Sequence, residues 1–179
     1  MKNSAKNDVV EFTLPHSTKY DMQTITPFFW FDNNAEEAIN FYTSTFRDSK
    51  ITSVSRYGEN TPGQVGKVMT IDFQLFGQNF IALNGGPVFT FSAAISFLVS
   101  CEDQEEVDNY WEKLLEGGSA SQCGWLTDRF GITWQIVPKA LGRLLQDEDP
   151  IKAQRVMQAM LKMIKIDISE LERAYHAAA

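Results

Sequence analysis

The sequence has little histidine, little cysteine and no excess of positive charge, and each shortage excludes a class of protein. Its 179 residues include two histidines and two cysteines, and 23 acidic against 16 basic side chains give a net charge of −7. Without a basic surface to neutralise phosphates, we expect no nucleic acid and no membrane as partner. The cysteines form no CxxC pair, which favours a reduced, cytoplasmic protein.

Long apolar stretches are also absent. No run approaches the roughly 18 residues that a membrane-spanning helix needs, and the N-terminal segment lacks the apolar core of a signal peptide. We interpret residues 1–21 as a flexible extension, in which Val9–Leu14 could form an edge strand. The composition, 44% hydrophobic and 12% aromatic, is ordinary for a globular protein.

A repeat of two similar halves organises the rest of the chain. Asn34–Tyr42 and Asp103–Trp111 share paired glutamates, an asparagine and two adjacent aromatic residues at the same spacing. Apolar side chains recur in both segments with the period of an amphipathic helix. Phe76–Ile81 and Phe130–Gln135 form a second matching pair, in which Phe-Gly predicts a tight turn before a strand.

Strand patterns surround the two predicted helices. Phe28–Phe31 and Ile95–Val99 are short apolar runs that precede them. Ile51–Tyr57 and Val68–Leu75 follow the first helix, and the latter alternates apolar and polar side chains as a half-buried strand does. Each half is therefore expected to contain one strand, one helix and about three further strands, with the sheets buried against their helices or each other.

Three helices are predicted after the repeat. Pro138 suits the first position of a helix that ends near Leu145. Asp149 and Pro150 are the N-cap and first residue of a second helix. Asp167–Glu170 has capping-box spacing for the last helix. The apolar stripe of the second helix consists of Val156, Met160 and Ile164.

The segments "ITPFFWFDNNAEEAINFY", "LNGGPVFTF", "ISFLVSCEDQEEVDNYWEKL" and "CGWLTDRFGITWQIVP" carry a family resemblance. The chain resembles the glyoxalase–dioxygenase (vicinal oxygen chelate) superfamily, and within it the PhnB-like branch, often labelled 3-demethylubiquinone-9 3-methyltransferase. The tail from Asp147 is similar to that branch's C-terminal helices. The resemblance implies an α+β fold, in which two βαβββ modules (residues 22–138) form a curved mixed sheet around a cup. A C-terminal helical extension (residues 139–179) and a homodimer are also implied.

Metal-dependent members of the superfamily take ligands from the first and last strands of each module. The corresponding positions here are Thr26 or Pro27, Ile81, Ile95 or Ser96, and Gln135. Only Gln135 could coordinate a metal, and a lone amide oxygen is a weak ligand. Both histidines, His16 and His176, lie outside the repeat. We therefore expect no metal and no other cofactor.

The methyltransferase label finds no support in the glycine pattern. A cosubstrate with an adenosine group usually requires a glycine-rich loop between a strand and a helix. Gly85-Gly86 instead predicts a turn after a strand, and Gly117-Gly118 a helix C-cap. Cys123 could be a reactive thiol, but with no histidine nearby a packed side chain is the simpler interpretation. Asp128–Gly131 has the residues of a tight turn, which explains them without function.

Neutral polar side chains among many aromatic ones favour a small-molecule pocket, although an aromatic core would have the same composition. The main hypothesis is a metal-free protein that binds a small apolar or aromatic molecule in the cup, with no catalytic residue assigned. A metal-dependent glyoxalase or dioxygenase and a ligand-free dimeric scaffold are the alternatives. The predicted ligand-binding residues are Thr26, Phe28, Trp30, Asn84, Ser96, Cys123, Trp125 and Gln135.

Gln135 is the polar exception in the predicted strand Ile132–Val137. Alternation should place it in the cup with Thr133 and Val137, while the bulkier Ile132, Trp134 and Ile136 pack toward the helices. An unpaired amide in a dry core would cost about 1–3 kcal/mol. We therefore expect a hydrogen-bond partner for Gln135, such as Ser96, water or a ligand.

The scarcity of metal-binding side chains leads to a first testable prediction. After equilibration with zinc, nickel or iron and dialysis, the purified protein should retain far less than one ion per chain in elemental analysis. The physical reason is that Gln135 alone cannot replace three or four strong donors. Stoichiometric metal that disappears in the Gln135→Leu variant would contradict this.

Overall fold

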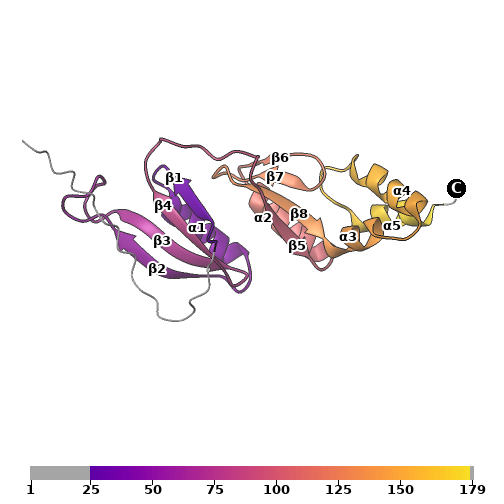
Figure 1. Ribbon diagram of the computed structural model, residues 1–179, viewed down its shortest axis with the longest axis horizontal. Helices are drawn as coiled ribbons and strands as arrows, with labels where there is room; N and C mark the ends of the chain where they lie inside the picture. Colours follow the sequence, from indigo (N-terminus) through magenta and orange to yellow (C-terminus); the bar gives the residue numbers. More distant parts are fainter. Residues whose placement is uncertain (1–24, 178–179) are drawn as a thin grey trace, which may run out of the picture.

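The computed structural model describes residues 25–177, which form two similar βαβββ modules and a C-terminal helical part (Figure 1). The first module contains β1 (Phe28–Phe31), α1 (Ala35–Thr45), β2 (Lys50–Arg56), β3 (Val68–Leu75) and β4 (Gln78–Asn84). The second contains β5 (Phe97–Cys101), α2 (Gln104–Leu115), β6 (Ser119–Ala120), β7 (Trp125–Thr127) and β8 (Thr133–Pro138). The predicted doubled unit is confirmed. The possible strand Val9–Leu14 lies outside the described residues.

Each module folds into a four-stranded mixed sheet with the same strand order. The orders are β1-β4-β3-β2 and β5-β8-β7-β6, with the first pair of each sheet parallel and the others antiparallel. The register is also equivalent, since Phe28 lies beside Ile81 in the first module and Leu98 beside Gln135 in the second. Hydrogen bonding between strands stops at each module, so two sheets replace the expected single sheet.

Both Phe-Gly segments form the tight turns that the sequence predicts. Phe76 and Gly77 both have positive φ, 49° and 76°, as the two-residue turn between β3 and β4 requires. In the second module the Gly131 N–H donates to the Asp128 carbonyl at 3.0 Å, and Gly131 has φ 90°. These turns begin β4 and β8, the strands next to β1 and β5.

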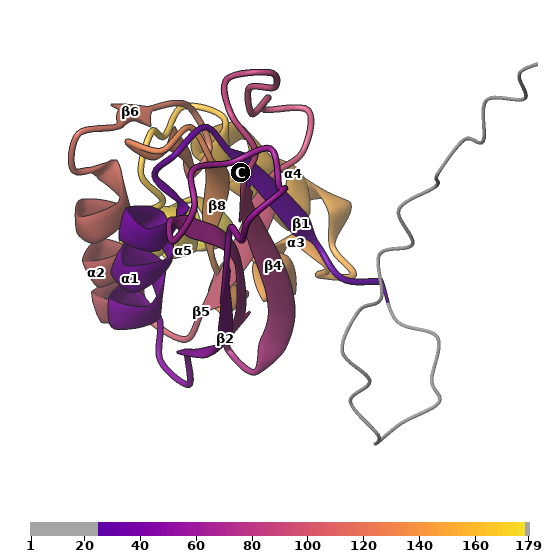
Figure 2. The same cartoon turned by 90° about the vertical axis from the view of Figure 1, so that its left-hand side faces the viewer.

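The two faces of each sheet differ in burial. Helices α1 and α2 cover one face, and both lie on the same side of the molecule (Figure 2). On that side the strands bury side chains such as Ile71 and Phe73, which pack in one core with Ile39 of α1. We call the opposite side, which faces away from α1 and α2, the cup face. Alternation along each strand therefore separates a buried apolar set from a partly exposed one.

The aromatic core crosses the boundary between the modules. The Phe97 ring on β5 lies 5.1 Å from the Phe29 ring on β1, measured between centroids. The Trp134 indole on β8 lies 5.4 Å from Tyr42 and 5.1 Å from Phe46, both from the first module. Tilted and edge-to-face pairs of this kind are favourable beyond their burial. The two modules therefore share one core.

Asp128, at the turn between β7 and β8, accepts four hydrogen bonds in this core. Its Oδ1 accepts the backbone N–H groups of Phe130 and Ile132 at 2.9 and 3.0 Å. Its Oδ2 accepts the Tyr42 hydroxyl at 2.7 Å and the Trp134 indole N–H at 2.8 Å. Burial, followed by the charge of Asp128, raises the pKa of Tyr42 well above its usual value. Asp128 is thus more than the turn residue that the sequence predicts.

The C-terminal part contains α3 (Lys139–Leu145), α4 (Pro150–Met160) and α5 (Ile168–His176). The Asp149 and Asp167 side chains cap α4 and α5 as predicted, each accepting a backbone N–H at 2.9 Å. Pro138 is the N-cap of α3 and not its first helical residue, because it still pairs with Cys101 as the last residue of β8. No helix among residues 25–177 is long and apolar enough to cross a membrane.

Two element boundaries differ from the sequence prediction. Ile164 does not continue the α4 stripe: α4 ends at Met160, and Ile164 is 57% exposed. The chain leaves the helix after Met160 because the carbonyls of Met163 and Ile164 bond outside it. They accept the N–H groups of Cys123 and Gly124 at 2.8 and 2.7 Å. The strand predicted at Ile95 begins at Phe97, because Ile95 closes a turn onto the Ser92 carbonyl.

Replacing Tyr42 by phenylalanine should destabilise the protein by about 1.5–3 kcal/mol, the usual value of a buried hydrogen bond to a charged group. Equilibrium urea unfolding would measure the change. Tyr175→Phe is the matched control, because the Tyr175 hydroxyl also donates to a carboxylate, Asp147, at 2.6 Å but at a less buried place. Equal losses of unfolding free energy in the two variants would show that the Tyr42–Asp128 bond contributes no more than the less buried Tyr175–Asp147 bond.

Candidate functional site

The cup face contains most of the side chains predicted to bind a ligand. Residues paired across neighbouring strands lie on the same face of a sheet, so the strand register defines this surface. In the first module its rows are Phe28–Ile81–Asp72 and Trp30–Leu83–Thr70. In the second module its rows are Leu98–Gln135–Trp125 and Thr133–Thr127.

Gln135 has the orientation and the partner that the sequence predicts. Its Nε2 donates to the Ser96 hydroxyl at 2.8 Å, while Leu98 and Trp125 flank it on the cup face. Ile132, Trp134 and Ile136, on the opposite face, are at most 3% exposed in the shared core. Among residues 25–177 no group donates to the Gln135 carbonyl oxygen, which is only partly buried. A ligand could therefore use it as an acceptor.

Thr26 and Phe28 occupy the equivalent place in the first module. Thr26 lies two residues before the start of β1 and is partly buried, and the Pro27 carbonyl accepts the Ile81 N–H at 3.0 Å. Phe28 is 54% exposed on the cup face, and its counterpart Leu98 is 59% exposed. Two large apolar side chains therefore remain open to solvent on the strands that face the module boundary.

Trp30 is held in place by the segment that follows β4. Its indole N–H donates to the Gly86 carbonyl at 2.9 Å, and its ring meets Phe89 edge-on with centroids 5.1 Å apart. A Cβ at Gly85 would lie 2.3 Å from the indole ring, so only glycine permits this approach. Trp30 thus forms a rigid, half-buried wall at one end of the cup face.

Asn84 lies elsewhere than the sequence analysis assumed. It shares the helix-facing side of β4 with Ala82, so its side chain does not point into the cup. Its Oδ1 accepts the Ala35 N–H at 2.9 Å, capping α1 from outside the helix, and its Nδ2 donates to the Val68 carbonyl at 3.0 Å. The Tyr57 hydroxyl donates to the Asn84 carbonyl. Both polar atoms of the Asn84 amide are therefore already hydrogen-bonded, and they link β4 to α1 and β3.

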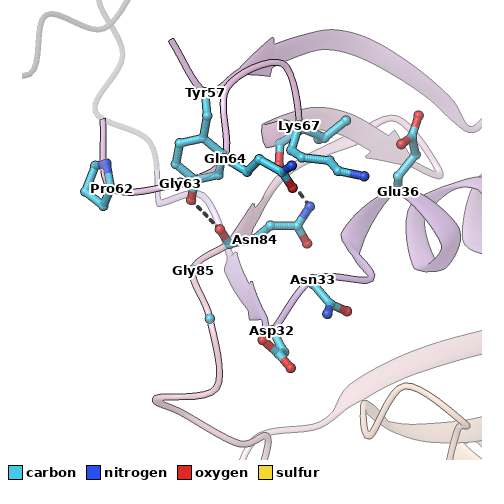
Figure 3. A pocket seen from close by; sticks show the side chains of 12 residues that line it. Asp32, Asn33, Glu36, Tyr57, Pro62, Gly63, Gln64, Lys67, Asn84 and Gly85 are labelled. Atoms are coloured by element: carbon cyan, nitrogen blue, oxygen red, sulfur yellow. Dashed lines mark hydrogen bonds between the residues drawn. The ribbon is translucent and has the colours of Figure 1, made fainter. Parts of the chain in front are cut away.

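A cavity of about 630 Å³ opens beside Asn84, between the ends of β1 and β4 and the β2–β3 connection (Figure 3). Its side chains are mostly polar and exposed, with Lys67, Asp32 and Glu36 as the charged groups. It lies at the end of the first module, away from Gln135 on the second. Its lining residues are Asp32, Asn33, Glu36, Tyr57, Pro62, Gly63, Gln64, Lys67, Val68, Asn84, Gly85 and Gly86.

Neither cysteine is placed for nucleophilic chemistry. Cys101 is fully buried, and burial raises the pKa of its thiol to about 12, with Glu106 and Asp103 adding to the effect. Cys123 has φ 58° and donates its N–H to Met163 in the C-terminal part. It precedes β7 at the junction with this extension, whereas Trp125 and Gln135 lie on the cup face.

The positions at which the family resemblance would place metal ligands do not fit a metal ion here. Ile81 has no donor atom, Thr26 and Ser96 offer hydroxyls, and the Gln135 amide nitrogen is bonded to Ser96. Within the described part of the chain, no three His, Cys, Asp or Glu side chains are grouped to hold an ion. We derive no chemistry through a metal.

The strand-to-helix connections also lack the geometry of a dinucleotide or adenosine loop. Residues 32–34 join β1 to α1, and Glu102-Asp103 joins β5 to α2, without a glycine in either. Gly85 and Gly86 follow β4 and donate their N–H groups to Phe31 and Asp32. Gly117 has φ 72° just after α2, as predicted for a C-cap.

Asp72 is a cup-face residue that sequence reasoning missed. It lies on β3 between Ile81 of β4 and Ser53 of β2, and burial raises the pKa of its carboxyl. The alternation in Val68–Leu75 does group Asp72 with Thr70 and Gln74. Only the position of α1, however, decides which of the two sets faces the cup.

Comparison with known proteins identifies the family. Residues 23–137 match the family model described as 3-demethylubiquinone-9 3-methyltransferase. The PhnB protein of Bacillus cereus is 41% identical, with a TM-score of 0.61 over 65% of this chain and 99% of that chain. Protein PA1353 of Pseudomonas aeruginosa, 20% identical with a TM-score of 0.55 over 65% of this chain and 98% of that one, shares the fold. No curated protein matches the chain.

The family match ends at residue 137, next to the last residue of β8, so α3 to α5 lie beyond it. The matched part includes both modules and all the cup-face residues named above. Together with the strand order and register, this match assigns the double module: the chain belongs to the 3-demethylubiquinone-9 3-methyltransferase family and is a PhnB-like protein.

Proposed function

We propose that the protein binds a small, largely apolar or aromatic molecule on the cup face without the help of a metal ion. The observation that carries this proposal is the half-buried Gln135 amide, held by Ser96 at 2.8 Å between Leu98 and Trp125. A few oriented polar groups among apolar walls are typical of small-molecule sites. The hydrogen bond that Gln135 Nε2 donates to the Ser96 hydroxyl orients the amide before a ligand arrives, which lowers the entropic cost of binding.

The apolar walls supply the affinity in this proposal. Phe28 and Leu98 are more than half exposed in the single chain, and covering apolar surface contributes about 25 cal/mol per Å². Trp30 and Trp125 add aromatic surface whose positions are fixed by β1 and β7. The cup is favoured over the cavity beside Asn84, because that cavity is lined by exposed charged groups and a fully committed amide.

The proposed function is binding and includes no methyl transfer. The methyl transfer in the family's name would need a site for a methyl donor, and the strand-to-helix connections of residues 25–177 lack the glycine-rich loop of the common type. A reduced, cytoplasmic location completes the proposal, and the two free thiols of Cys101 and Cys123 are compatible with it.

We also propose a homodimer. The segment between β4 and β5, at the margin of the cup face, exposes Val88, Phe89 and Ile95, the last at 74%, and a monomer rarely leaves a large apolar patch uncovered. Of the α4 methionines, Met160 packs against the C-terminal cluster, whereas Met157 is exposed. Ile151 and Leu161 are exposed beside Met157, so α4 is the competing apolar surface for a partner.

Gln135→Leu should weaken binding of 2-phenylethanol, a small aromatic probe, by about three- to tenfold, the value of one hydrogen bond. Stability should stay within about 1 kcal/mol, because leucine fits a half-buried strand position. Chemical-shift titration would give affinity, and urea unfolding stability. Gln158→Leu, at an exposed site on α4, should leave both unchanged. A large loss of stability with no effect on binding would make Gln135 a structural amide.

Sedimentation equilibrium at micromolar concentration should give twice the chain mass of 20.3 kDa. Ile95→Glu should shift the protein toward the monomer, because a partner would have to bury the introduced charge. Met157→Glu on α4 is the control for the competing surface. A wild-type mass equal to one chain would exclude the dimer, and dissociation by Met157→Glu alone would move its interface to the C-terminal part.

A further inference from the structure

Asp72 lies in the middle of the cup face of the first module. Its strand, β3, is flanked by β4 and β2, and Asp72 shares a row with Ile81 and Phe28. Aspartate is disfavoured within strands, and a carboxylate beside apolar side chains loses hydration. The position therefore costs stability unless a positive or hydrogen-bond-donating partner compensates.

Residues 25–177 do not supply that partner. The four ion pairs of this range involve Glu102, Glu106, Asp108 and Glu170. The polar neighbours of Asp72 on its own strand face are engaged elsewhere, since Thr70 bonds with Ser55, and Gln74 donates to Asn79. The raised pKa of the Asp72 carboxyl has burial as its cause, as expected for a carboxylate that lost water without gaining a cation.

We propose that Asp72 makes the cup selective for a small aromatic or apolar amine, whose protonated nitrogen it binds. This inference rests on the function proposed above and adds the chemical class of the ligand. The Gln135 carbonyl oxygen is an acceptor on the cup face of the other module, so both halves of the cup present hydrogen-bond acceptors to a ligand that supplies donors. The net charge of −7 also attracts a cation in preference to an anion.

Two probes isolate this selectivity. 2-Phenylethylamine and 2-phenylethanol share the ring and the two-carbon chain and differ in carrying an ammonium or a hydroxyl group. At pH 7 and low salt, the wild-type protein should bind the amine about fivefold more tightly, as one partly exposed charge-assisted contact predicts. The preference should shrink in 0.5 M sodium chloride through screening. Shifts of the Ile81 and Asp72 amide signals would report contact with the first module, and shifts of the Ser96 and Gln135 signals contact with the second.

Asp72→Asn, which keeps the shape and removes the charge, should lower the ratio of the two affinities to about one. Glu112→Gln, the same change of charge at an exposed site on α2, should keep the wild-type ratio. Equal wild-type affinities, or a preference that survives Asp72→Asn, would overturn the inference while leaving small-molecule binding intact. If neither probe shifts the Ile81, Asp72, Ser96 or Gln135 signals, binding in the cup itself is refuted. The wild-type comparison remains decisive should Asp72→Asn fail to fold.

Discussion

The four hydrogen bonds accepted by Asp128 are the constraint on which the arrangement of the two modules depends. Two of them shape the β7–β8 turn, one fixes the Trp134 indole on the helix side of β8, and one joins Tyr42 of the first module. A carboxylate that is 4% exposed is tolerated only when its lone pairs are satisfied. Turn, strand orientation and module contact are therefore coupled, and none of the three can change without leaving a buried charge incompletely bonded.

This coupling determines what the cup presents. Because Asp128 holds Trp134 toward the helices, the strand period places Gln135 on the opposite face, where Ser96 orients its amide. In the first module the same alternation places Asp72 on that face, since Ile71 and Phe73 are buried under α1. The two modules thus offer chemically different halves built on one topology: a neutral amide in the second and a carboxylate in the first. A substitution on the cup face of one module would therefore change ligand selectivity without changing the fold.

The C-terminal helices are attached through backbone as well as side chains. Cys123 and Gly124 donate to the Met163 and Ile164 carbonyls, and Gly124 is also the acceptor for the Ile136 N–H on β8. A Cβ at Gly124 would lie 2.7 Å from the Ile136 carbonyl oxygen, so this junction requires glycine. The extension lies beyond the family match, yet it is joined to the strand that carries Gln135. A change in α4 could therefore reach the cup through β8 and not only through a partner surface.

The sequence by itself determined the doubled βαβββ unit, the Phe-Gly turns, the caps of α4 and α5, and the face of Gln135. All of these follow from local periodicity or from the conformational preferences of single residues. Tertiary structure alone decided the roles of Asn84, Asp128 and Asp72. The Asn84 amide is used up by α1 and β3, and Asp128 bonds a tyrosine 86 positions away. Asp72 faces the cup because α1 covers the other side of β3. Each depends on contacts between segments distant in sequence, which periodicity does not encode.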